Sequence, residues 1–134
     1  MSKLSVFLHP ATASEEKEVV ISHRFQDEQG QPVPFRIRAL TQEENDAITR
    51  QATRRRKEGG QTVEQLDSVD FTRRMVVAAT VEPDFSSKEL CEGCGVMDPL
   101  LVPGKLLLSG EYARLVKEIT ELSGFGGIED EVKN

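Results

Sequence analysis

The stretch that decides the fold is residues 33–44, VPFRIRALTQEE, where an alternating apolar pattern runs directly into a helix-start signal. The first part has the period of two that is typical of a half-buried strand, with an apolar face formed by Val33, Phe35, Ile37 and Ala39. Thr41 and Glu44 then have the spacing of a capping box, in which each side chain bonds to the other residue's backbone N–H. The stretch therefore predicts a strand followed at once by a helix.

The residues before this stretch show the same alternation and predict a partner strand. Its inward face would carry Val19, Ile21, His23 and Phe25. Gly30 lies between the two runs and can adopt a positive φ without steric conflict. We therefore expect a β-hairpin over about 18–25 and 33–40, with His23 as a core histidine. Because two strands alone are marginally stable in water, helices must cover the apolar face.

Helix signals follow along the rest of the chain. The expected helices span about 42–57, 63–80, 87–93 and 110–122, the third opened by a capping box at residues 86–89 and the last capped by Ser109. Residues 98–104 are expected to form a connector, with a helical or tight turn at 105–108. The prediction is an α+β fold, mainly helical, with the hairpin packed against about four α-helices. Residues 1–17 are expected to form a flexible arm, 18–125 a single domain and 126–134 a flexible acidic tail.

The amino-acid composition argues against several classes of protein. The chain has 134 residues, with 17 basic and 23 acidic side chains and a net charge of −6. This acidic balance argues against broad nucleic-acid binding, which usually accompanies a basic surface. No apolar run approaches the roughly 18–20 residues that span a bilayer, and two cysteines cannot form the disulfide framework of a small secreted domain. We expect a cytoplasmic protein with no membrane association.

The pair Cys91 and Cys94 is the first candidate for chemistry. A structural zinc site needs four ligands, and His9 and His23 lie far upstream of this single pair. Incidental thiols are therefore the favoured interpretation; a metal shared between chains and a redox pair are the alternatives. The sequence shows no nucleophile motif and no phosphate-binding glycine loop. We expect no catalytic residue, no metal, no cofactor and no enzymatic activity.

A basic run marks the end of the expected helix over 42–57. It contains Arg50, Arg54, Arg55, Arg56 and Lys57. Cations in the last turn suit the negative end of the helix dipole, so a solvated helix end is the simplest interpretation. An acidic protein partner is the second interpretation. Nucleic acid is the third, and no aromatic platform accompanies the charge.

An excess of large aliphatic side chains marks residues 100–108. Six of them fall within nine residues: Leu100, Leu101, Val102, Leu106, Leu107 and Leu108. One face of a helix cannot hold three consecutive leucines. Either the segment is enclosed on all sides, or part of it faces a partner groove or a second copy of the chain.

The order of these features resembles a known family. The hairpin ends in FRIRALT at 35–41, VEPDF follows at 81–85, and the last helix runs from Gly110-Glu111 to Gly124-Phe125. This succession, over about residues 15–127, resembles the XkdN-like tail assembly chaperones of tailed phages and defective prophages.

The resemblance implies a non-enzymatic role in the bacterial cytoplasm. Such proteins are thought to bind the long, aggregation-prone tape-measure protein while tail tube subunits polymerise around it. The expected partners are therefore the tape-measure protein and the tail tube protein, with self-association left open. Arg54, Arg55 and Arg56 are the candidates for electrostatic recruitment, and Leu101 and Leu106 for apolar contact. The alternative is a prophage regulatory or nucleic-acid-binding module that uses the basic run.

Overall fold

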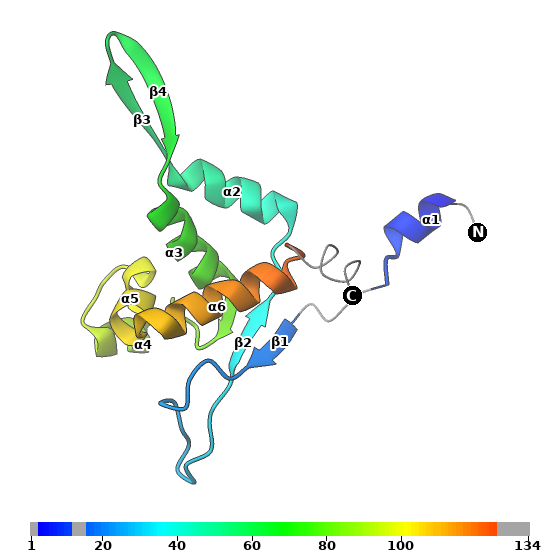
Figure 1. Cartoon of the computed structure of the whole chain (residues 1–134), viewed down its shortest axis with the longest axis vertical. Coiled ribbons are helices and arrows are strands. Elements are labelled where there is room, and N and C mark those ends of the chain that lie inside the picture. The colour runs from blue at the N-terminus through cyan, green and yellow to red at the C-terminus, as the bar shows by residue number, and fades with distance from the viewer. Residues whose placement is uncertain (1–2, 12–15, 126–134) are drawn as a thin grey trace.

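The computed structural model describes residues 3–11 and 16–125 and confirms the α+β prediction. A three-stranded antiparallel sheet has the order β1 (Glu16–Val19), β2 (Phe35–Arg38) and β5 (Thr80–Glu82) (Figure 1). The β1–β2 register runs from Glu16 opposite Arg38 to Val19 opposite Phe35. Strand β5 was not predicted from the sequence, and it completes the sheet on the other edge of β2.

The first hairpin pairs over a shorter length than its alternation suggested. Between residues 20 and 34 the chain leaves the ladder, and a single bridge joins Gln26 to Pro32. Phe35 and Ile37 are buried as predicted, whereas His23 and Val33 are exposed. The prediction of a core histidine is therefore wrong: Ile21, just beyond the end of β1, is still fully buried, but His23 lies on the segment that has left the ladder.

Helices account for much of the remaining chain. Their bounds are α1 Lys3–Leu8, α2 Gln42–Ala52, α3 Ser68–Ala79, α4 Lys88–Cys94, α5 Val102–Leu106 and α6 Ser109–Leu122, with a 3-10 turn at Pro99–Leu101. The Thr41 capping box is confirmed, since the Glu44 N–H donates to the Thr41 hydroxyl at 3.2 Å and the Thr41 N–H donates to the Glu44 carboxylate at 3.1 Å. Ser87, one residue later than expected, caps α4. The predicted connector at 98–104 is helical for much of its length.

The helices predicted over 42–57 and 63–80 are wrong where they approach each other. Helix α2 ends at Ala52, and the chain then forms β3 (Thr53–Glu58) and β4 (Gln61–Leu66) before α3 begins. Gly59 and Gly60 have φ of 57° and 82°, so both central residues of the turn have the positive φ of a type I′ hairpin. This turn brings the two polar segments together as a hairpin, called here the β3–β4 ribbon.

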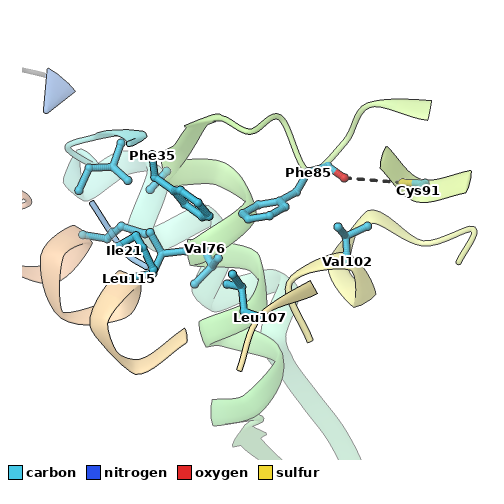
Figure 2. Close-up of a cluster of buried hydrophobic side chains, with 11 residues drawn as sticks. Ile21, Phe35, Val76, Phe85, Cys91, Val102, Leu107 and Leu115 are labelled. Atoms are coloured by element: carbon cyan, nitrogen blue, oxygen red, sulfur yellow. Dashed lines mark hydrogen bonds between the residues drawn. The ribbon is translucent and has the colours of Figure 1, made fainter. Parts of the chain in front are cut away.

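The core lies between the three-stranded sheet and helices α3 and α6 (Figure 2). Phe85 is the largest fully buried side chain of the described residues. The same cluster includes Ile21, Phe35, Val76 and Leu115 (Figure 2). The Cys91 thiol donates to the Phe85 carbonyl oxygen at 3.6 Å, which ties α4 to this cluster.

The first and last segments that the structure describes lie outside this core. No residue of α1 is buried, and its apolar side chains Leu4, Val6, Phe7 and Leu8 are exposed. At the other end, α6 finishes in a Schellman motif, with Gly124 at a φ of 100° and the Phe125 N–H donating to the Thr120 carbonyl at 3.1 Å. The predicted acidic tail at 126–134 lies outside the described residues.

Candidate partner-binding surfaces

The β3–β4 ribbon carries the predicted basic residues and projects from the ends of α2 and α3 away from the rest of the molecule (Figure 1). Arg54, Arg55 and Arg56 are all exposed and lie on β3, not on a helix end. Because strand side chains alternate, Arg54 and Arg56 share one face while Arg55 and Lys57 share the other. The ribbon therefore presents cations on both of its faces.

Each of the three arginines has a carboxylate partner. Arg54 Nη2 lies 2.8 Å from Asp70, Arg55 Nε lies 3.0 Å from Glu64, and Arg56 Nη2 lies 3.1 Å from Glu58. Solvent-exposed pairs of this kind typically contribute no more than about 1 kcal/mol. A carboxylate on a partner can therefore replace the exposed Glu64 or Glu58 at little cost, whereas Asp70 is largely covered and also bound by Arg74.

The leucine-rich segment is enclosed only in part. Val102 and Leu107 are buried and Leu106 is half-buried, whereas Leu101 is 41% exposed and Leu108 is 59% exposed. Helix α3 packs against this segment on one side. The structure thus places Leu101 and Leu106 away from the ribbon and does not bring them together with the three arginines (Figure 1).

A hollow between α3, α5 and α6 brings together residues that the sequence analysis did not connect. Its volume is about 290 Å³, and it is lined by Val69, Arg73, Pro103, Gly104, Leu107, Ser109 and Tyr112. On α3, the helical spacing of four and three residues puts Val69, Arg73 and Val76 on one face. Val76 is fully buried, and Val69 at the outer end is 59% exposed. An arginine inside an otherwise apolar helical stripe is the sequence signal that could have indicated this α3–α5–α6 hollow.

Arg73 differs from its neighbour Arg74. Arg74 Nε donates to Asp70 at 2.9 Å, and this bond is the largest cause of the lowered pKa of Asp70. Within the described residues, Arg73 is exposed and has no carboxylate within ion-pair distance. Burial raises the pKa of the half-buried Tyr112, and the positive charge of Arg73 offsets part of this rise. The hollow thus joins apolar side chains with an unpaired cation.

The comparisons with known proteins agree with this architecture. The profile of the phage XkdN-like tail assembly chaperone proteins (TAC) matches residues 4–134. The chain belongs to this family of phage tail assembly chaperones. The assignment implies a non-enzymatic role.

Two relatives from Bacillus subtilis (strain 168) support the assignment. The phage-like element PBSX protein XkdN is 36% identical, with 98% of this chaperone and 93% of the relative covered. The uncharacterized protein YqbN is 39% identical, with 91% and 84% covered. A crystal structure of YqbN superposes with a TM-score of 0.76 at 34% identity, and the match covers 93% of this chaperone and 98% of that chain.

An ion pair between the buried Glu111 and the exposed Arg24 fixes the start of α6 and was not foreseen from the sequence. Glu111 accepts from Arg24 Nε at 2.8 Å and Arg24 Nη2 at 2.6 Å, and from the Leu108 N–H at 2.8 Å. These bonds, led by those from Arg24, lower the pKa of Glu111 to about 2. The pair joins the 20–34 segment to the first turn of α6.

The cysteines of this chaperone are free thiols. Cys91 is buried and Cys94 is half-buried. Across residues 3–11 and 16–125, no group of three or more His, Cys, Asp or Glu side chains could hold a metal ion. Within the same ranges, no helix is long and apolar enough to cross a membrane.

Proposed function

We propose that this chaperone binds the tape-measure protein in the bacterial cytoplasm during tail assembly and has no catalytic activity. The observation that carries the proposal is the set of surfaces that the core does not use, namely the β3–β4 ribbon and the partly exposed 100–108 segment. A protein that keeps a long, aggregation-prone client soluble needs apolar contacts together with charge. Both are available here, on a chain whose family membership is in tail assembly.

The two surfaces have different roles in this proposal. Arg54, Arg55 and Arg56 recruit acidic stretches of the client. The partners of Arg55 and Arg56 are exposed and exchangeable, and the Arg54 side chain is itself half-exposed although its partner Asp70 is largely covered. Leu101 supplies apolar contact from an exposed position, and Leu106 supplies it from a half-buried one. The tail tube protein is a further partner, in line with the stage of assembly that the family serves.

Co-expression of the chaperone with the tape-measure protein of its own locus tests the proposal. We expect the client to be retained in a pull-down and to be more soluble than when it is expressed alone. The variant R54E/R55E/R56E and the variant L101S/L106S should each reduce retention. The exposed residues Arg50 and Val33 provide matched controls, R50E and V33S, that should retain the client. A client that is neither bound nor solubilised by the wild-type protein contradicts the proposal.

Nucleic-acid binding is the second candidate, favoured by one observation. The major groove of DNA admits a two-stranded β-ribbon, and the β3–β4 ribbon carries four cations. The net charge of −6 and the carboxylate partners of all three arginines favour a protein client instead. Titration of duplex DNA and RNA across a salt series separates the two candidates, because phosphate binding weakens steeply as salt rises.

A further inference from the structure

The α3–α5–α6 hollow has the size and lining of a site for protein side chains. At about 290 Å³ it lies at the lower limit of the range for small-molecule pockets, roughly 300–1,000 Å³. Leu107 and Pro103 are buried in its floor, and Tyr112 forms part of its wall. Val69, which is 59% exposed, extends the apolar lining outward.

The positive charge of Arg73 indicates which kind of chemical group the hollow can receive. Arg73 lines the hollow and, within the described part of the chain, has no carboxylate partner, although the chain has more acidic than basic residues. A cation beside desolvated apolar surface is complementary to a carboxylate that lies next to apolar side chains. On an amphipathic helix, such groups are neighbours at spacings of three or four residues.

We propose that the α3–α5–α6 hollow receives an amphipathic helical segment of the tape-measure protein. A large apolar side chain of that segment fills the hollow, and a Glu or Asp about one turn away pairs with Arg73. This inference rests on the proposed function and identifies the chemistry of the client segment. It also places the main contact on Val69, Arg73 and Leu107, in addition to the ribbon arginines and Leu101.

Gly104 offers a direct way to block the hollow. It lies in α5, lines the hollow, and a Cβ added there would meet no atom within 4 Å. The substitution G104L should therefore place a side chain in the hollow without displacing the chain's own atoms. Gly93 in α4 has the same open surroundings but lies elsewhere, so G93L is the matched control.

The experiment measures retention of the co-expressed tape-measure protein by each chaperone variant. We expect G104L and R73E each to reduce retention at least tenfold, R73K to keep most of it, and the controls G93L and R50E to match the wild type. Circular dichroism spectra and thermal unfolding verify that each variant is folded.

The outcomes separate this inference from the proposed function. If the wild type does not bind the tape-measure protein, the proposed function fails and the inference fails with it. If the wild type binds and both G104L and R73E bind equally well, the inference alone is overturned. Loss in G104L with full retention in R73E overturns the carboxylate assignment and leaves an apolar occupant.

Discussion

The body of the molecule and the β3–β4 ribbon are held together by different interactions. In the body, buried side chains from the sheet, α3 and α6 form one cluster, and Glu111 is locked to Arg24 at the start of α6. The ribbon has no buried residue, and its side chains pair across water-exposed faces. The body therefore provides the stability of the domain, whereas the ribbon can exchange its ion-pair partners without unfolding the domain.

Phe85 tests the body side of this comparison and should give the largest effect. The substitution F85A removes the largest fully buried side chain and leaves a cavity, so we expect a loss of about 3–5 kcal/mol in the free energy of unfolding. Urea denaturation measures it. The control is F7A, because Phe7 on α1 is 77% exposed, and its effect should stay within about 0.5 kcal/mol. Equal effects of the two substitutions would contradict the assigned core.

Glu111 should make the stability of the body depend on pH. Its pKa falls from an ordinary 4.5 to about 2 on folding, and that of Glu44 falls equally through its bonds to Arg38 and Thr41. A lowered carboxyl pKa stabilises the fold above pH 4.5, and this stabilisation is lost as the pH falls from 4.5 towards 2. Urea denaturation at pH 7, 4.5 and 3 should show this decline.

The variant E111Q tests the same pH dependence by removing the charge of this side chain. It should be less stable than the wild type at pH 7, and the gap should narrow as the pH falls towards 3, because protonation then weakens the wild-type pair as well. On the ribbon, E64Q removes the exposed partner of Arg55 and should change the free energy of unfolding by less than about 1 kcal/mol. If E64Q lowered the free energy of unfolding as much as E111Q does, the ribbon would contribute to stability as the body does, and the proposed difference between the two regions would be wrong.

Replacement of the ribbon should give the smallest effect on stability. If a short Gly-Ser linker replaces residues 54–65, the body keeps its whole buried cluster, and Asp70 keeps its bond to Arg74. We expect the free energy of unfolding to change by less than about 1 kcal/mol, with reduced retention of the tape-measure protein. A variant that fails to fold would show that the ribbon is part of the folding unit.

Local signals predicted some parts of this structure well. The Thr41 capping box, the apolar faces of β2 and α6, and the Gly124 helix end all depend on residues close together in the sequence. The ribbon was missed because Arg, Lys, Glu and Gln favour helices, whereas the turn at Gly59 and Gly60 favours a hairpin.

Other features could not be foreseen because they depend on tertiary contacts. Arg24 and Glu111 are 87 residues apart in the sequence, and nothing near either residue indicates the other. The hollow likewise combines α3 with α5 and α6, so its lining emerges only after these helices pack. The sequence analysis chose Leu101 and Leu106 from the leucine segment, whereas Pro103, Gly104 and Leu107 of the same segment line the hollow together with Arg73, which has no carboxylate partner among the described residues.

Amide hydrogen exchange of the chaperone, alone and with the co-expressed tape-measure protein, tests the central claim most directly. We expect the client to slow exchange in residues 68–74, 102–112 and 53–66, because these segments contain the walls of the hollow and the ribbon. Exchange in β2, which is already protected by its two neighbouring strands, should not change. A bound client that leaves all three segments unprotected would contradict the account.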